Sequence, residues 1–565
     1  MTATILIGYV LNLTLERKVS VSIRQQSLGS VPEAVARWAQ RNKKNPIVVF
    51  ADAVEDGFDW DDFTEMYAAE GQPAVHPGRL AIVTILQHAF GLTDRQAVEC
   101  VDTRLDWKYA LRMDVNDPAF DHTVLVEFRQ RLLESGLQDL MLNKLLHIAH
   151  EKQILKHSKQ RTDSTHILAN VRTLGRLERI HEAMRAAIDA LLTHFPAVYM
   201  SFHDPNWIER YDRAPYRFKS PKEGKRRDAL AKQMGEDIST LLQAVDAVVV
   251  ENQGLSELHP ITALRAIFEQ QYLEKGKGFE LRDDEESIPP ASRIASPHDT
   301  DARFGKKGST RWLGYSTHFT ETCDEDAPRL ITNVETVPGG PTDEHMLPKI
   351  HSSLKSRGYA PSQHFVDSGY TDVEVMRTSE EQLGITVIGP ARPGPSWQTA
   401  AGKGFDAANF SIDFENKKAT CPNGVTSSIW SERSTKGSII VGFPAKECGR
   451  CPFRSDCTKS TSGGRRLEVK TADLFQYLQR TRHREQTTEF KELYRIRSGV
   501  EGTHSQAART CRFRRSRYTG LQKTQLQSWL VAAGITAIRI ARWLIGLPLS
   551  ETRTTIREKL AAVAA

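Results

Sequence analysis

The chain has 565 residues, of which 39 % are hydrophobic and 26 % charged, values typical of globular proteins with several domains. This composition excludes disordered, collagenous and predominantly membrane-embedded proteins. The 76 Lys and Arg residues exceed the 70 Asp and Glu residues by little, and the formal charge of +6 does not by itself predict a nucleic-acid partner.

Seven cysteines are too few, and odd in number, for a secreted disulfide scaffold. The first 18 residues lack the features of a signal peptide. Arg539 and Arg542 interrupt the longest apolar stretch, 529–547, which we therefore interpret as an amphipathic or buried helix rather than a membrane span. We expect a cytoplasmic protein.

Residues 1–76 receive no role, although the apolar run at 46–50 predicts a strand. From Pro77 onward, apolar residues recur at helical spacing, and residues 77–150 are predicted to form an all-helical unit. Short helices joined by tight turns favour a DNA-binding domain of the helix-turn-helix type. A packing or dimerisation bundle explains the same pattern equally well.

Residues 151–395 are expected to form an α/β unit with a mixed sheet flanked by helices. A long charged helical region at about 174–290 interrupts it. The other expected elements are strands at 160–168, 314–320, 330–337, 364–366 and 385–388, and helices starting near 342 and 371. Long helices are expected again over 471–550, followed by a tail at 551–565.

A segment at 396–470 carries four of the seven cysteines: Cys421, Cys448, Cys451 and Cys457. Two of them form a CxxC pair, and the flanking CPNG and CGRCPF sequences are similar to the knuckles of a zinc ribbon. We therefore predict that the four cysteines bind one Zn²⁺. The ion is expected to be structural rather than catalytic, because four thiolates leave no open coordination position. Free thiols or a redox pair are the alternatives.

Three acidic residues are candidates for a shared metal site. Asp163 and Asp367 are expected at or just beyond strand ends, while Tyr494, Arg497 and Glu501 are spaced to lie along one helix face. Singly, these residues are more typical of caps, turns and solvated faces. Three converging carboxylates, however, repel one another unless cations bind them, and paired Mg²⁺ ions suit phosphoryl transfer on nucleic acid.

Basic residues are concentrated after the third acid, since no Asp or Glu occurs between Glu501 and Glu551. Arginines with interleaved aromatic residues are suited to hold phosphates and stack on bases, although a solvated basic face is the alternative. The candidate DNA-binding residues are Arg512, Arg514, Arg515, Arg517, Tyr518 and Lys523.

From about 77 to 547, the order of motifs resembles the DDE transposases of bacterial insertion sequences, whose catalytic domain has an RNase H-like fold. The motifs are GLTDRQAVE, DST at Asp163, SPHDTDARFGKKGSTRWLGYSTHFTET, DSGY at Asp367, the cysteine segment, and the Tyr494, Arg497 and Glu501 signature ahead of FRRSRYTGLQK. The resemblance implies that Asp163, Asp367 and Glu501 are catalytic and bind two Mg²⁺ or Mn²⁺ ions.

The resemblance also implies the partners: the inverted repeats at the ends of the element, target DNA, and further copies of the chain in a synaptic complex at the bacterial nucleoid. It implies that Tyr494 and Arg497 support a phosphate. Related signature helices usually carry a Lys seven residues after the Glu; here Ala508 occupies that position, and the phosphate contact is assigned to Arg509. The alternatives are an RNase H-like nuclease without strand transfer, and a decayed, DNA-binding transposase.

Overall fold

The computed structural model describes residues 21–22 and 29–547, apart from gaps at 56–57, 59–60, 69, 213–217, 219–220, 222–223, 250–251, 253, 277, 284–287, 290–291, 341–342, 393–395 and 434–436. The tail predicted at 551–565 and most of the first 28 residues lie outside the described part. Within it, no helix has the length and apolarity needed to cross a membrane.

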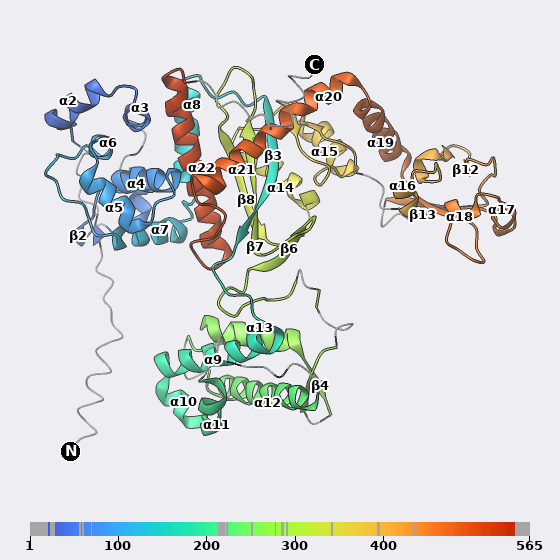
Figure 1. The fold of residues 1–565 in the computed structure, drawn as a ribbon, viewed down its shortest axis with the longest axis horizontal. Coiled ribbons are helices and arrows are strands. Elements are labelled where there is room, and N and C mark those ends of the chain that lie inside the picture. Colours follow the sequence, from blue (N-terminus) through green and yellow to red (C-terminus); the bar gives the residue numbers. More distant parts are fainter. Residues whose placement is uncertain are drawn as a thin grey trace, which may run out of the picture.

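A six-stranded mixed sheet lies at the centre of the molecule (Figure 1). Strand β3 pairs with β7 in antiparallel and with β9 in parallel orientation, and β10 extends the parallel side. Strands β6 and β8 pair with successive lengths of β7. The strands are β3 (Lys159–Leu168), β6 (Arg303–Lys307), β7 (Thr310–Thr322), β8 (Ile331–Pro338), β9 (Gln363–Phe365) and β10 (Thr386–Ile388). The expected α/β class, with an RNase H-like mixed sheet flanked by helices, is confirmed.

Helices cover both faces of this sheet. Because side chains alternate along a strand, Thr317 of β7 faces α22 (Leu521–Leu544), where it lies 3.3 Å from Ser528. On the opposite face, α14 (Met346–Ser356) and α15 (Val373–Leu383) pack with β9 and β10 around a core that includes Leu347 and Val387.

Helix α22 also packs against the N-terminal helices, so those helices and the sheet share one hydrophobic core. Figure 1 shows α22 between the two parts. A Cβ atom on Gly534 of α22 would lie 2.6 Å from the backbone nitrogen of Ala89, and this contact therefore requires glycine. The N-terminal helices are α2 (Glu33–Arg41), α3 (Pro46–Ala53), α4 (Pro77–Ala89), α5 (Asp94–Thr103), α6 (Leu105–Ala110), α7 (Thr123–Glu134) and α8 (Leu140–Glu151).

The strand predicted at 46–50 is wrong, because these residues begin α3. The Asn45 side chain accepts a hydrogen bond from the backbone N–H of Ile47, and Pro46 occupies the first helical position. Residues 47–50 are all buried, and a short, fully buried apolar run does not distinguish a strand from a helix by its periodicity.

Two insertions each have a hydrophobic core of their own. The first lies below the sheet in Figure 1 and contains α9 (Arg176–His194), α10 (Pro196–Phe202), α11 (Pro205–Tyr211), α12 (Lys225–Val248), α13 (His259–Gln271), β4 (Tyr272–Lys275) and β5 (Gly278–Leu281). The second, beyond α19 in the same view, contains α16 (Trp397–Ala401), β11 (Ser411–Asp413), β12 (Lys418–Thr420), β13 (Ile429–Arg433), β14 (Ser438–Gly442), α17 (Ala445–Arg450), α18 (Arg454–Cys457) and β15 (Arg466–Lys470).

After this second insertion the chain returns to the sheet through α19 (Ala472–Glu485), α20 (Thr488–Tyr494), the 3₁₀ turn η5 (Arg495–Gly499) and α21 (Val500–Arg509). Phe490 of α20 packs with Phe365 of β9 and Ile388 of β10, and it thereby brings the segment that follows to the parallel edge of the sheet.

Candidate active site

Asp163 lies in the middle of β3 rather than at its end. The expectation of a strand end is wrong because β7 pairs with β3 continuously from Gln160 to Leu168, so the strand extends well beyond the acid. Its carboxylate is buried, with 4 % of the side chain exposed, and Oδ1 accepts a hydrogen bond from the backbone N–H of Ser164 at 2.8 Å.

Asp367 follows β9, as the apolar strand before it predicts. Its Oδ1 accepts a hydrogen bond from the backbone N–H of Gly369 at 2.9 Å. A Cβ atom on Gly369 would approach Asp367 Oδ1 at 2.9 Å and Asp343 Oδ2 at 3.2 Å. The glycine therefore leaves the space in which these two carboxylates lie.

Tyr494, Arg497 and Glu501 do not share one continuous α-helix. Tyr494 ends α20, Arg497 lies in η5, and Glu501 is in the first turn of α21. The Tyr494 hydroxyl donates to the carbonyl of Val366 at 3.2 Å, next to Asp367. The 3₁₀ turn tightens the segment, and the three residues still reach one region at the sheet.

The Arg497 guanidinium contacts all three acids. Its Nη2 lies 2.8 Å from Asp163 Oδ2 and 3.5 Å from Asp367 Oδ2, and its Nη1 lies 3.6 Å from Glu501 Oε1. Acids from a central strand, a loop after a second strand and a late helix therefore converge on a single cation.

The carboxylates influence one another electrostatically. Burial, and then the negative charge of Asp163, raises the pKa of Glu501. Burial lowers the pKa of Arg497, but Asp163 and Asp367 more than offset this effect and the net shift is upward. A site with this density of negative charge favours cations.

Asp343, which precedes α14, is a fourth acid at this site that the sequence reasoning missed. Its Oδ2 lies 3.4 Å from the Ser164 hydroxyl. Burial raises the pKa of Asp343 to about 6, and the charges of Asp367 and Asp163 add to the increase. The local sequence GGPTDEHM gives no signal for this role, because an acid before a helix ordinarily reads as a cap.

Two further side chains border the acids. Lys307 of β6 lies 3.6 Å from Asp163 Oδ1. His504 of α21 lies 3.9 Å from Asp163 Oδ2, and neither of its ring nitrogens has a hydrogen-bond partner among the described residues. Burial lowers the pKa of His504 to about 4. His318 of β7 is hydrogen-bonded to the Tyr370 hydroxyl at 2.6 Å.

Within the described ranges, no group of three or more His, Cys, Asp or Glu side chains is arranged to hold a metal ion. At the acid site the reason is visible, since Arg497 lies between the carboxylates. The donor set itself, carboxylate oxygens of Asp163, Asp367 and Glu501 with Asp343 nearby, suits hard divalent cations. The residues therefore fit Mg²⁺ or Mn²⁺ once Arg497 leaves them.

The basic segment after α21 is partly exposed and partly internal. Arg514 Nη1 donates to the carbonyl of His166 at 3.0 Å, and Arg517 Nη1 donates to that of Leu92 at 2.6 Å. Tyr518 is packed near Arg129. The exposed members of the predicted set are Arg512, Arg515 and Lys523, and the exposed Arg509 ends α21.

The four cysteines of the second insertion line one small pocket. The backbone N–H of Val425 donates to Cys421 Sγ at 3.3 Å, and that of Arg465 donates to Cys448 Sγ at 3.4 Å. All four thiols are unbridged. Such N–H···S contacts stabilise thiolates, the form that binds zinc.

Comparison with known families assigns two parts of the chain. Residues 420–541 match the family described as Transposase DDE domain, and residues 37–131 match the Transposase domain (DUF772). The first match includes all four cysteines of the second insertion and Glu501, but neither Asp163 nor Asp367. A search of curated proteins gave no match, and a search of solved structures gave none either. Both family matches agree with the resemblance to DDE transposases of insertion elements.

Proposed function

For a chain that carries a transposase DDE domain and a second transposase domain, we propose that it cuts DNA at the ends of its own insertion sequence and joins the 3′ hydroxyl to target DNA. The observation that carries this proposal is the convergence of Asp163, Asp367 and Glu501 on one guanidinium. Hydrolysis and strand transfer both displace an oxygen at phosphorus, and one site therefore serves both.

In this proposal the three acids hold two divalent ions, Mg²⁺ or Mn²⁺, which when bound activate the attacking oxygen and stabilise the leaving one. Arg497 moves from the carboxylates to a DNA phosphate. Tyr494 stays anchored to the Val366 carbonyl and fixes the start of the turn that carries Arg497. Arg509 would contact a phosphate further along the substrate.

The decisive test is Asp367→Asn. This change removes one anionic ligand and is expected to lower cleavage of a cognate DNA end at least 1000-fold, while binding of that end is retained. Glu374→Gln, an exposed acid at the start of α15, is the matched control and should cleave normally. Retained cleavage by Asp367→Asn would rule out the assigned site.

A strand-transfer assay with precut ends separates the transposase from its nearest alternative. Joining of the 3′ hydroxyl to target DNA supports the transposase, whereas cleavage without joining identifies a nuclease. A chain that binds the ends but cleaves nothing in Mg²⁺ or Mn²⁺ is a decayed, DNA-binding copy.

The exposed basic residues Arg512, Arg515 and Lys523 are proposed to contact the DNA backbone. Changing all three to Gln should reduce the slope of log binding constant against log salt by about 2 to 3, near 0.9 for each lost phosphate contact. Arg226→Gln, on the helical insertion, is a single-charge control expected to leave the slope unchanged. An unchanged slope in the triple variant would remove this segment from the interface.

We also propose that Cys421, Cys448, Cys451 and Cys457 bind one structural Zn²⁺, with Cys100, Cys323 and Cys511 as packing residues. Purified protein should then contain one zinc per chain, and Cys448→Ser should lower that content and destabilise the second insertion. Cys100→Ser, in the N-terminal helices, should keep the zinc. Protein that is fully folded and free of zinc would contradict this proposal.

A further inference from the structure

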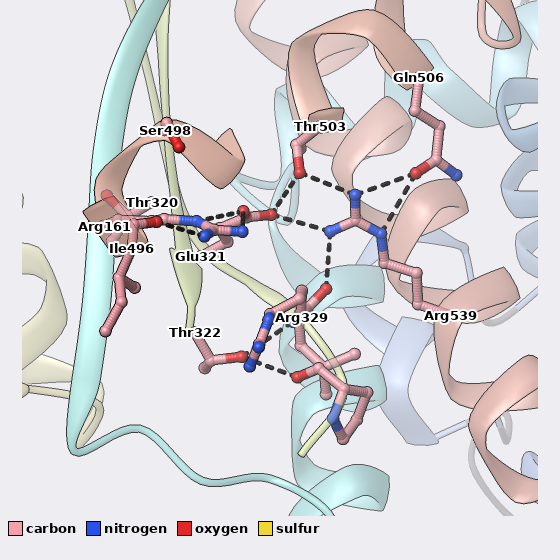
Figure 2. A network of polar contacts seen from close by, with 12 residues as sticks. Arg161, Thr320, Glu321, Thr322, Arg329, Ile496, Ser498, Thr503, Gln506 and Arg539 are labelled. Atoms are coloured by element: carbon pink, nitrogen blue, oxygen red, sulfur yellow. Dashed lines mark hydrogen bonds and ion pairs between the residues drawn. The ribbon is translucent and has the colours of Figure 1, made fainter. Parts of the chain in front are cut away.

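Glu321 of β7 is a carboxylate with no exposed surface, and it lies within a network of polar contacts (Figure 2). Its Oε1 accepts a hydrogen bond from Arg161 Nε at 2.7 Å and forms an ion pair with Arg161 Nη2 at 2.6 Å. Its Oε2 accepts from Arg539 Nη1 at 2.8 Å and from the Thr503 hydroxyl. Both carboxylate oxygens therefore bind two donors each.

Two partners of Glu321, Arg161 and Thr503, come from elements that carry proposed catalytic acids. Arg161 lies two residues before Asp163 on β3, and because side chains alternate along a strand, both point to the same face of the sheet. Thr503 lies two residues after Glu501 on α21. One buried carboxylate thus connects the strand of the first acid to the helix of the third.

A second connection leads to Arg497. The Arg161 Nη1 donates to the carbonyl of Ile496 at 2.6 Å, directly before Arg497. A Cβ atom on Gly499 would lie 2.1 Å from the same Nη1, and the junction between η5 and α21 therefore packs directly on this guanidinium. Figure 2 shows Arg161 between the Ile496 backbone and Glu321.

Arg539 of α22 connects Glu321 to α21 from the side opposite Arg161. Its Nη2 donates to the Thr503 hydroxyl at 2.7 Å and to Gln506 Oε1 at 3.0 Å, so that it contacts α21 at two points one turn apart. Its Nη1 also donates to the carbonyl of Arg329 at 2.7 Å. Each of these hydrogen bonds requires a specific angle between donor and acceptor. Together they restrict the position of α21 along the sheet to a smaller range than apolar packing alone would.

A buried charge network is a weak source of stability, because desolvation offsets most of the Coulomb attraction. Burial acts to raise the pKa of Glu321, but the charges of Arg539 and Arg161 outweigh it and the pKa falls, so the group stays ionised. The interface between β3 and α21 thus contains ionised groups, although apolar residues often give a buried site equal or greater stability. What the charges add is a defined geometry.

We propose that Glu321 is a positioning residue, which through Arg161 and Thr503 holds β3 and α21 in the register that brings Asp163 and Glu501 to one pair of divalent ions. This inference rests on the proposed function, since it assigns Glu321 to the assembly of that same site. Glu321 itself touches neither DNA nor the ions.

The test uses two threonines that are similarly buried in helices but have different hydrogen-bond partners. Thr503→Val removes the hydroxyl that joins α21 to Glu321, and the full-length chain keeps both Glu–Arg pairs. Thr536→Val on α22 is the control, because Thr536 is also fully buried and its hydroxyl accepts one backbone hydrogen bond, from Ile331 at 3.3 Å, away from the acids. Mn²⁺ affinity is measured by electron paramagnetic resonance for both variants. The melting temperature of each variant is measured as well, so that a loss of affinity can be separated from a loss of stability.

Thr503→Val is expected to weaken Mn²⁺ binding about tenfold and to lower the maximal rate of DNA-end cleavage by a similar factor, with end binding unchanged. Thr536→Val should change neither Mn²⁺ affinity nor the maximal cleavage rate, even if it lowers the melting temperature as much as Thr503→Val does. Thr503→Ser, which keeps a hydroxyl, should restore Mn²⁺ affinity.

Equal Mn²⁺ affinity in Thr503→Val and Thr536→Val would overturn the positioning role and leave the proposed function intact. Wild-type protein that binds no Mn²⁺, or binding that Asp367→Asn leaves unchanged, would overturn the proposed function and the positioning role with it. Glu321→Gln is the second variant, and if it folds, it should weaken Mn²⁺ binding at least as much as Thr503→Val.

Discussion

Arg497 carries one positive charge among three carboxylates, and this sets up a competition with divalent ions. While the guanidinium lies 2.8 Å from Asp163 Oδ2, it neutralises part of the charge that would otherwise repel the acids from one another. An ion that takes its place must first break these pairs. Under the proposed function, Arg497 is therefore expected to stabilise the metal-free fold and to weaken ion binding at the same time.

Arg497→Met should raise Mn²⁺ affinity about tenfold, equivalent to about 1.4 kcal/mol, and should lower the melting temperature only in the absence of metal. Titration calorimetry and thermal melts with and without Mn²⁺ measure both effects. Arg495→Met, an exposed neighbour in η5, should change neither. Weaker Mn²⁺ binding in Arg497→Met would mean that the arginine assists the ions rather than competes with them.

At this scale the sequence singled out Asp163, Asp367, Arg497 and Glu501 as a combination, although each pattern alone is weak. The structure brings these four side chains together, and their catalytic role stays a prediction. Asp343 and Glu321 were missed, because the significance of each lies in partners far away along the chain. Glu321 occurs in an ordinary strand, and only the folded structure places Arg161, Thr503 and Arg539 around it.

At the scale of elements, two buried histidines join α14 to the sheet. His351 Nε2 is hydrogen-bonded to His364 Nδ1 at 2.8 Å, and His364 Nε2 to the Thr162 hydroxyl at 2.7 Å. Both rings lie in the core, where burial lowers the pKa of His351 to about 4 and the pKa of His364 well below its usual value. Both are therefore neutral in the folded protein at pH 7.

This pair should make the protein sensitive to acid. In the unfolded chain both histidines bind a proton near pH 6.5, whereas in the fold they resist it, so stability falls as the pH drops from 6.5 toward 4, by up to about 1.4 kcal/mol per pH unit for each histidine. Urea unfolding between pH 7.5 and 5 measures this slope. His351→Asn should reduce it, and His147→Asn, an exposed histidine of α8, should not. The same slope in both variants would refute the prediction.

Helices and strands were predicted correctly where the periodic pattern of apolar residues extended over many residues or where strands alternated with helices. Examples are α4, β3, β7 and β8. The error at α3 arose from a short apolar run whose period carries no information. The signature residues Tyr494, Arg497 and Glu501 were assigned to one helix face, but the chain breaks there into α20, η5 and α21. Helical spacing of side chains does not reveal a local 3₁₀ turn.

At the scale of the whole molecule, α22 joins the N-terminal helices to the six-stranded sheet through one core. Its Gly534 passes the Ala89 backbone too closely for any side chain. Gly534→Ala should therefore destabilise the protein by about 1 to 3 kcal/mol through overpacking. Gly502→Ala, in α21 with no atom within 4 Å of the new Cβ, should instead stabilise it by about 0.5 to 1 kcal/mol.

Urea unfolding of the two glycine variants checks this prediction. An unchanged free energy of unfolding in Gly534→Ala would contradict the prediction, because it would mean that α4 and α22 can move apart without destabilising the protein. This contact could not be predicted from the sequence, because the two helices are more than 400 residues apart and each reads only as an apolar helix.

The order in which the acids occur along the chain has a consequence during synthesis. A ribosome delivers Asp163 and Asp367 before Arg497 and Glu501, and α22, which contacts α21, emerges after all four. A nascent or prematurely terminated product that stops before α20 therefore lacks a complete acid site. Under the proposed function, DNA cleavage is therefore expected only from a polypeptide that extends through α21 and α22.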